Sequence, residues 1–340
     1  MKARRSLARE AGLIAVAFLA TLILLAGLAL GLTGRAPTGS PGPTSGAASL
    51  PAVGFLTPSP TASGGASHSA SVSPSADPVL VGAGDIADCS SSGDEETAKL
   101  IDGIAGTVFT AGDGAYPDGT AGQYADCYGP TWGRFKARTR PAVGNHDYQT
   151  KGAAGYLGYF GAASTNADGQ TWYSFDLGRW HIIVLDANCG EIKGCDSKSA
   201  EGHWLSADLD ASDARCTLAI WHQPRFSSGE HGNDLAVGPF WTALYRAGAD
   251  VVVNGHDHDY ERFKPQTPSG AVDFDRGIRE FVAGTGGAPI RGFQGTKPNS
   301  DIRAAVSPGV LKLTLHPNGY DWAFVSTTGI FSDSGTASCH

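Results

Sequence analysis

The sequence predicts an α/β fold in which two packed sheets are flanked by helices. Short apolar runs bounded by turn residues recur beyond residue 77, as expected of buried strands. Segments with helical spacing alternate with these runs at first, whereas strands dominate toward the end of the chain. Several of the apolar runs also end abruptly in Asp, Asn or His, which would gather polar side chains at one edge of the sheets.

The expected strands are short runs rich in Val, Ile, Leu, Phe and Thr. In chain order they cover 78–84, 107–112, 171–177, 180–186, 217–222, 250–254, 279–283, 310–315 and 320–326. The last two strands should form a hairpin, because Pro317, Asn318 and Gly319 lie between them. Apolar residues at helical spacing predict helices over 93–101, 200–209 and 235–247.

The N-terminal segment differs from the rest of the chain. Four basic residues precede an uncharged apolar run over 11–33, which is long enough to cross a bilayer. We therefore interpret 1–35 as a signal peptide or a signal anchor that directs the remainder outside the cytoplasm. If it is retained, residues 11–33 would tether the protein to the outer face of the membrane. The alternative of a buried core helix is disfavoured, since so uniform an apolar run seldom packs inside a domain.

Residues 36–77 consist almost entirely of Ser, Thr, Pro, Gly and Ala. Such a segment cannot bury enough apolar surface to offset its ordering entropy, so we expect a disordered linker. The folded domain is then predicted to cover 78–340.

The formal net charge is −8, and because the first 35 residues are basic, the rest of the chain is more acidic still. An acidic domain is a poor candidate for a nucleic-acid-binding surface. If the protein acts on anionic phosphates, metal ions are the obvious source of local positive charge. The sequence does not indicate an oligomeric state.

All six cysteines lie beyond the apolar segment, at Cys89, Cys127, Cys189, Cys195, Cys216 and Cys339. An even number in an exported chain favours disulfides. Structural zinc is the competing interpretation, but the CxxC pairs that such a site usually contains are absent. The sequence does not select among the pairings that six cysteines allow. Our working guess is Cys89–Cys127, Cys189–Cys195 and Cys216–Cys339.

Potential metal ligands follow five of the apolar runs. They are Asp85 after VGAG, Asp113 after FTAG with Tyr116 three residues later, Asn145 and His146 after PAVG, His222 after LAIW, and His256 and His258 after VVVNG. Each position alone is commonly a turn residue or a satisfied polar group, but five in succession are not readily produced by chance. Two neighbouring cations need a shared anionic ligand, and Asp113 is the natural bridge. Asp, Asn and His suit iron, zinc or manganese.

The blocks GDIA (84–87), GDGAY (112–116), GNHD (144–147), WH (221–222) and GHDH (255–258) together resemble the signature of calcineurin-like metallophosphoesterases. Tyr116 resembles the purple acid phosphatase branch of that superfamily. The resemblance implies a four-layer α/β/β/α sandwich of two mixed sheets. One departure is Ala87, where the family usually has Gly.

The resemblance also implies the role of each site residue. The first metal, Fe(III), would take Asp85, Asp113, Tyr116 and His258; the second, Fe(II), Zn(II) or Mn(II), would take Asp113, Asn145, His222 and His256. His146 and His231 would be catalytic and contact the substrate. If Tyr116 is only an ordinary turn aromatic, the protein would be a colourless di-zinc or di-manganese esterase.

The predicted function is that of an exported acid phosphatase that hydrolyses small phosphate monoesters by attack of a metal-bound hydroxide. A phosphodiesterase or nucleotide-processing enzyme on the same site is the nearest alternative. A non-catalytic surface protein that keeps the fold is a further alternative, which the intact ligand set disfavours.

Overall fold

The computed structural model describes residues 76–340. The predicted signal segment at 1–35 and nearly all of the predicted linker at 36–77 lie outside the described residues. Over 76–340, no helix is both long enough and apolar enough to span a bilayer.

The first sheet is mixed and has six strands in the described part of the chain. In spatial order they are β15 (Ser332–Ser338), β14 (Gly319–Ser326), β13 (Gly309–His316), β1 (Val79–Ala83), β3 (Thr107–Ala111) and β5 (Thr139–Ala142). Strands β1, β3 and β5 are parallel, whereas β13, β14 and β15 pair antiparallel. The parallel half therefore sends three successive loops to the same edge of the sheet.

The second sheet is also mixed, and seven of the described strands form it. In spatial order they are β12 (Ser300–Ala304), β10 (Tyr260–Phe263), β11 (Arg279–Ala283), β9 (Val251–Asn254), β8 (Cys216–Ile220), β7 (Trp180–Val184) and β6 (Tyr173–Leu177). Its centre, β7, β8, β9 and β11, is parallel. A short parallel pair, β2 (Ala87–Asp88) with β4 (Ala115–Tyr116), lies in the loops that follow β1 and β3.

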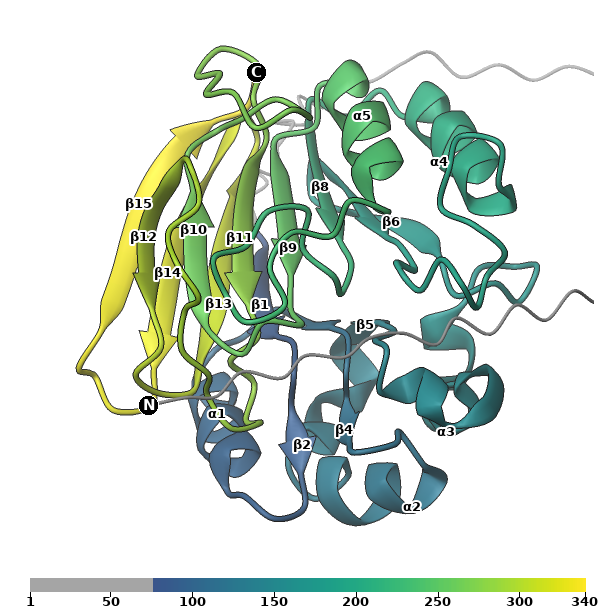
Figure 1. The fold of residues 1–340 in the computed structure, drawn as a ribbon, viewed down its shortest axis with the longest axis vertical. Coiled ribbons are helices and arrows are strands. Elements are labelled where there is room, and N and C mark those ends of the chain that lie inside the picture. Colours follow the sequence, from purple (N-terminus) through teal and green to yellow (C-terminus); the bar gives the residue numbers. More distant parts are fainter. Residues whose placement is uncertain (1–75) are drawn as a thin grey trace, which may run out of the picture. The chain divides into compact units, whose positions relative to one another are not determined.

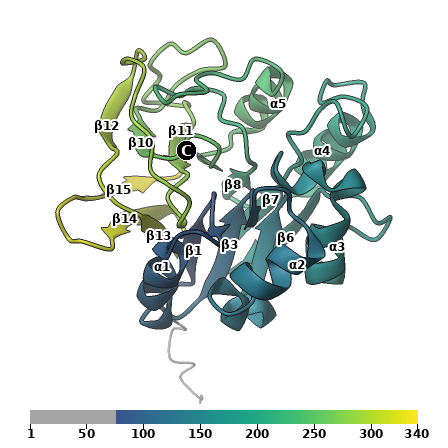
Figure 2. The same ribbon diagram turned by 60° about the horizontal axis from the view of Figure 1, so that its bottom comes forward.

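Within 76–340, five α-helices cover the outer faces of the two sheets (Figure 1, Figure 2). They are α1 (Gly93–Asp102), α2 (Ala121–Gln123), α3 (Ala154–Phe160), α4 (Ala200–Ala211) and α5 (Gly238–Ala247). Helices α1, α2 and α3 gather beside the first sheet, and α4 and α5 beside the second.

The alternation of side chains along the strands separates three hydrophobic clusters. Leu80 of β1 packs between the sheets in one cluster with Leu218 of β8. The next residue of β1, Val81, faces the other way into a cluster with Ile101 of α1. A third cluster lies under α4 and α5 on the second sheet. The layers thus run helix, sheet, sheet, helix, and the predicted α/β fold with two mixed sheets is confirmed.

Every strand and helix expected from the sequence is present, with small shifts at the ends. The largest shift is in α5, which begins at Gly238 rather than at 235. Pro239 lies in the first turn of this helix, where its missing N–H and fixed φ suit a helix start. Leu235, which precedes the helix, is exposed.

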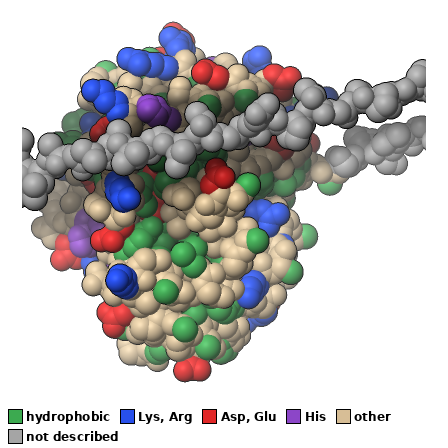
Figure 3. Space-filling view, turned by 90° about the vertical axis from the view of Figure 1, so that its right-hand side faces the viewer, with side chains coloured by type: hydrophobic (Ala, Val, Ile, Leu, Met, Phe, Trp, Pro, Cys, Tyr) green, Lys and Arg blue, Asp and Glu red, His purple; other side chains and the backbone are tan. Residues whose placement is uncertain are grey.

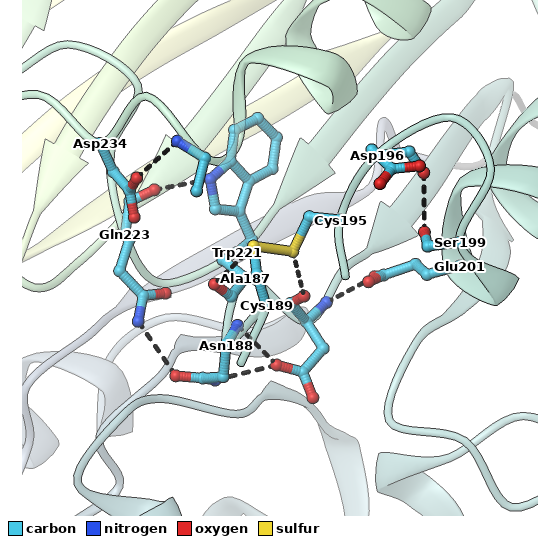
Figure 4. The surroundings of a disulfide bond; sticks show 12 residues. Ala187, Asn188, Cys189, Cys195, Asp196, Ser199, Glu201, Trp221, Gln223 and Asp234 are labelled. Atoms are coloured by element: carbon cyan, nitrogen blue, oxygen red, sulfur yellow. Dashed lines mark hydrogen bonds between the residues drawn. A yellow bond between two sulfur atoms is a disulfide. The ribbon is translucent and has the colours of Figure 1, made fainter. Parts of the chain in front are cut away.

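All three guessed disulfides are confirmed: Cys89–Cys127, Cys189–Cys195 and Cys216–Cys339. The first holds the loop after β2 to the segment after α2, and the last ties the C-terminal end of the chain to the start of β8. The second lies beside Trp221, near a hydrogen bond between Gln223 and Asn188 (Figure 4).

We expect the double variant Cys216→Ala, Cys339→Ala to lose about 3–4 kcal/mol of unfolding free energy, because this bond restricts a long stretch of the unfolded chain. Its sequence separation is 123, against 6 for Cys189–Cys195. The matched variant Cys189→Ala, Cys195→Ala should therefore lose less, about 2 kcal/mol. Denaturant unfolding of both variants measures the difference, and equal losses would contradict the chain-entropy explanation.

A buried histidine links the second sheet to α4. His181 Nε2 lies 2.8 Å from Asp208 Oδ2, and His181 Nδ1 lies 3.2 Å from Asp176 Oδ1. The hydrogen bond to Asp208 raises the pKa of His181 above its ordinary value, and burial opposes this only in part. The contribution of His181 to stability is therefore complete below the unfolded-state pKa of about 6.5 and is lost as the pH rises through the raised value.

We expect His181→Gln to cost about 1 kcal/mol of unfolding free energy near pH 5.5 and progressively less toward about pH 9. Chemical denaturation of both proteins across this range gives the difference directly. A difference that stays constant with pH would show that the charge of His181 does not contribute.

The surface beside the helices carries both signs of charge. On the face drawn in Figure 3, acidic and basic side chains are interspersed, and hydrophobic side chains lie among them. The visible part of this face therefore has no single strongly charged region.

Candidate metal centre

The loops that carry the predicted ligands meet where parallel strands of both sheets end. Asp85 N donates to Gly112 O at 3.1 Å, which joins the loops after β1 and β3. Gly255 N donates to His222 O at 3.0 Å, which joins the loops after β9 and β8. Gly84 N donates to Ala283 O at 2.9 Å and so connects the two sheets at this edge. Residues distant in sequence are thereby held side by side.

Three of the predicted ligands have left-handed backbone conformations. The φ angles are 60° at Asp85, 51° at Asp113 and 72° at His256. This region is uncommon for residues other than glycine and costs on the order of 1 kcal/mol for each residue. Such strain persists only where the surroundings enforce it, and here it turns each side chain sharply at the end of its strand.

Two glycines allow the close approach of these loops. A Cβ on Gly144 would lie 2.1 Å from Asp113 Oδ1. A Cβ on Gly112, whose φ is +84°, would lie 2.4 Å from His222 Nδ1. Neither position can accept a side chain without displacing a predicted ligand.

Four predicted ligands of the first metal meet at the hydroxyl group of Tyr116. This hydroxyl donates to Asp85 Oδ1 at 2.6 Å and lies 3.1 Å from Asp113 Oδ2. His258 Nε2 lies 3.2 Å from the hydroxyl and 3.2 Å from Asp85 Oδ1. The four side chains therefore converge on one point.

Two histidines predicted for the second metal lie beside this group. His222 Nε2 is 3.0 Å from Asp113 Oδ2, and His256 Nδ1 is 3.2 Å from His222 Nε2. Among the described residues, none donates a hydrogen bond to the buried Oδ1 of Asn145. A buried carbonyl oxygen without a donor is suited to a cation. Asp113 Oδ2 contacts both groups of side chains.

The two buried histidines are held in the orientation that metal binding needs. His222 Nδ1 lies 2.8 Å from Ala111 O, and His258 Nδ1 lies 2.9 Å from Pro289 O. A carbonyl oxygen can only accept, so each Nδ1 carries a proton, and each Nε2 is turned toward the carboxylates, where it could bind a metal ion in place of a proton. This arrangement is usual for histidines that bind metals.

Electrostatics at the site also favours a cation. Burial lowers the pKa of His222, but the carboxylates of Asp113 and Asp85 outweigh it and raise that pKa to about 10. Burial would raise the pKa of Asp85, yet His258 and His222 hold that pKa below its usual range. The carboxylates thus attract positive charge strongly, and together with the unpaired Asn145 oxygen they fit a pair of metal ions.

The two predicted catalytic histidines lie at the solvent-facing side of this group. His146 Nε2 is 4.0 Å from Asp113 Oδ2, and the side chain is 32% exposed. Its Nδ1 donates to Pro117 O at 2.6 Å. His231 is exposed, and its ring centroid lies 4.2 Å from that of His256. Substrate can reach both rings from solvent.

Ala87 does not disturb the site. It is fully buried and pairs with Ala115 in the short β2–β4 ladder. A methyl group is therefore accommodated where the family usually has Gly.

A network of polar residues in the loops after β5, β7 and β8 was not expected from the sequence. Asp186, fully buried, accepts from Tyr148 Oη at 2.6 Å and from Asn188 Nδ2 at 2.8 Å. Gln223 Nε2 in turn donates to Asn188 Oδ1 at 3.0 Å (Figure 4). This network connects the loop after β5 with the loop after β8. The one feature of the sequence that could have indicated this network is the position of Asp186 at the end of an apolar run.

A family model for calcineurin-like phosphoesterases matches residues 73–260, more than half of the chain. The chain therefore belongs to the calcineurin-like phosphoesterase family, and it is a metallophosphoesterase related to purple acid phosphatases. The family binds dinuclear metals, and this chain has a buried group of Asp and His side chains, in which potential ligand atoms of Asp85, Asp113 and His222 lie within 4.8 Å of one another.

The relatives are similar over part of their length. Purple acid phosphatase 21 of Arabidopsis thaliana is 31% identical over 166 residues, covering 42% of this chain and 37% of the relative. An uncharacterized protein of Mycobacterium tuberculosis is 29% identical over 185 residues, covering 43% of this chain and 35% of the relative. The chain thus matches well under half of these proteins.

Solved structures support the fold. Purple acid phosphatase PPD1 from yellow lupin superposes with a TM-score of 0.62 at 18% identity, covering 78% of this chain and 54% of that chain. GAP50, described as the anchor in the inner membrane complex of Plasmodium, gives a TM-score of 0.59 at 17% identity, covering 78% and 90%. At these identities the likeness concerns the fold alone.

Proposed function

We propose that this protein is an exported phosphatase that hydrolyses small phosphate monoesters at a dinuclear metal centre. The observation that carries the proposal is the convergence of the predicted ligands at one strand edge, with Asp113 Oδ2 in contact with both His222 and Tyr116. The similarity to purple acid phosphatases, including one from Arabidopsis thaliana, supports the monoesterase interpretation.

The ligand sets follow the two groups of side chains described above. Asp85, Asp113, Tyr116 and His258 would hold Fe(III), while Asp113, Asn145, His222 and His256 would hold Fe(II), Zn(II) or Mn(II). When bound, the metals would neutralise the phosphate oxygens and activate water as a nucleophile near or below neutral pH.

The chain's own residues would then orient the substrate and move a proton. His146 keeps its Nδ1–H on the Pro117 carbonyl, which fixes the ring and leaves Nε2 free, 4.0 Å from Asp113 Oδ2. A protonated His146 can donate from Nε2 to the departing ester oxygen. His231, packed on the ring of His256, would contact the substrate from another side.

The three disulfides support a location outside the cytoplasm, since such bonds persist in oxidising compartments. Export through 1–35, tethering through 11–33, a flexible linker at 36–77 and a single folded domain at 78–340 belong to the same proposal.

A non-catalytic role is the alternative function. The similarity to GAP50 is compatible with it, because the structure of that protein is described as an anchor. The orientation of His222 and His258 toward buried carboxylates argues for a functional metal centre here.

Metal analysis combined with assays on a chromogenic monoester and a diester tests the proposal. Two metals per chain and turnover of the monoester would support it, whereas a preference for the diester would favour the phosphodiesterase alternative. A metal-free, inactive protein would refute both.

If Tyr116 binds Fe(III), charge transfer from its phenolate oxygen to the iron should give the protein a visible absorption band. We expect Tyr116→Phe to abolish this band in the iron-loaded protein, because the substitution removes only that oxygen. That oxygen lies within 3.2 Å of three other predicted ligands of the first metal. The absorption spectra of the two proteins at equal iron content provide the measurement. A band that survives in the variant would exclude Tyr116 as the source of the colour.

A further inference from the structure

A loop beside the metal centre is held at several points by the segments that carry the predicted ligands. Ala288 N donates to Asp85 O at 2.9 Å, and Arg291 N donates to His258 O at 2.9 Å. Further along, Gln294 N donates to Ser228 O at 3.0 Å. The backbone of Arg291 is therefore fixed relative to the site, and its side chain extends from a defined position.

The side chain of Arg291 contacts the predicted catalytic histidine. Its Nη1 lies 2.9 Å from His231 Nε2. The His231 ring packs on His256, with centroids 4.2 Å apart, and His256 Nδ1 lies 3.2 Å from His222 Nε2. Arg291, His231, His256 and His222 thus form an ordered series from the solvent-facing side to the buried carboxylates.

The guanidinium group retains donors for a ligand. A guanidinium has five N–H donors, and the contact with His231 uses one of them. Glu230 Oε2, at 3.6 Å, balances the charge only loosely, and the side chains of Arg291 and Glu230 are 37% and 50% exposed. An anion arriving from solvent can therefore compete with Glu230 for Arg291.

We propose that Arg291 is a specificity-determining residue that binds a second anionic group of the substrate, a carboxylate or a further phosphate on the leaving group. This inference rests on the proposed phosphatase function. The scissile phosphate would lie at the metal ligands, whereas Arg291 is separated from His222 by the rings of His231 and His256. A group held by Arg291 is thus displaced outward from the phosphorus, and in a phosphate monoester only the leaving group can carry such a group.

Two matched substrate pairs test this placement in the metal-loaded protein. They are phenyl phosphate with 4-carboxyphenyl phosphate, and propyl phosphate with propane-1,3-diol bisphosphate. We expect Arg291→Ala to reduce kcat/KM roughly tenfold on the anionic member of a pair, mainly through KM, and by a clearly smaller factor on the neutral member, which is affected only through the lost contact with His231. Glu230→Gln should raise kcat/KM on the anionic member, because it removes the charge that competes for Arg291. Arg276→Ala, which removes an arginine stacked on Tyr245 away from the site, is the matched control.

A second readout does not require turnover. Calorimetry should show that Arg291→Ala weakens binding of 4-carboxyphenylphosphonate about tenfold and weakens binding of phenylphosphonate by a clearly smaller factor. Equal losses on both members of each pair, or no loss on either, would overturn the inference. A response to only one pair would still support it and would show which anion Arg291 binds. Failure of the wild-type protein to hydrolyse any of the four substrates would instead refute the phosphatase proposal, and this inference with it.

Discussion

Replacing Asp113 with alanine is expected to abolish binding of both metal ions and to reduce hydrolysis to background. Its Oδ2 lies 3.0 Å from His222 Nε2 and 3.1 Å from the Tyr116 hydroxyl, so it is the carboxylate oxygen that both groups of ligands share. Two cations held close together repel each other strongly, and without a shared anion neither is well compensated. Metal analysis after dialysis and a monoester assay measure the two effects.

The variant needs a control for folding, because Asp113 also accepts a hydrogen bond from the backbone N–H of His146 at 2.8 Å. Asp118→Ala removes the same charge from an exposed position five residues away and should retain both metals. Asp113→Asn keeps the size of the side chain and serves if the alanine variant does not fold. Retention of both metals by a folded Asp113 variant would refute the bridging role.

Most of the fold could be predicted because its central strands are short apolar runs buried on both faces. Strand β9 (VVVN) is such a case, and it lies where the sequence indicated. Strand β10 (YERF) was missed, because Glu261 and Arg262 are buried there through partners distant in sequence. Arg262 Nε, for example, donates to Asp333 Oδ2 at 2.7 Å. Strand β15 (SDSGTAS) has no apolar pattern and is defined by its pairing with β14.

The residues of the candidate site could be picked out in the sequence for a related reason, and their roles stay predictions. Asp, Asn and His residues that directly follow an apolar run can be recognised in the sequence, and the parallel strands bring these positions to one edge of the fold. Asp186 and Arg291 make contacts that only the folded chain creates, with Tyr148 in one case and His231 in the other. No local pattern in the sequence distinguishes Arg291 from an ordinary surface arginine.

Replacing His146 with alanine is expected to slow turnover by roughly 10²–10⁴-fold while the metal content stays unchanged. The side chain is 32% exposed, and its Nε2 is 4.0 Å from Asp113 Oδ2, whereas His222 Nε2 lies 3.0 Å from that oxygen. His203→Ala, which removes an exposed histidine from α4, is the matched control and should leave turnover unchanged.

The loss should also depend on the leaving group if His146 supplies a proton. An alkoxide leaves poorly unless it is protonated, whereas 4-nitrophenolate is stable as an anion near neutral pH. The His146→Ala variant should therefore be impaired more strongly on an alkyl phosphate than on 4-nitrophenyl phosphate. Equal impairment on both substrates would indicate that His146 orients the phosphate without transferring a proton. Loss of metal from the variant would contradict a catalytic role altogether, because it would place His146 among the groups that hold the metals.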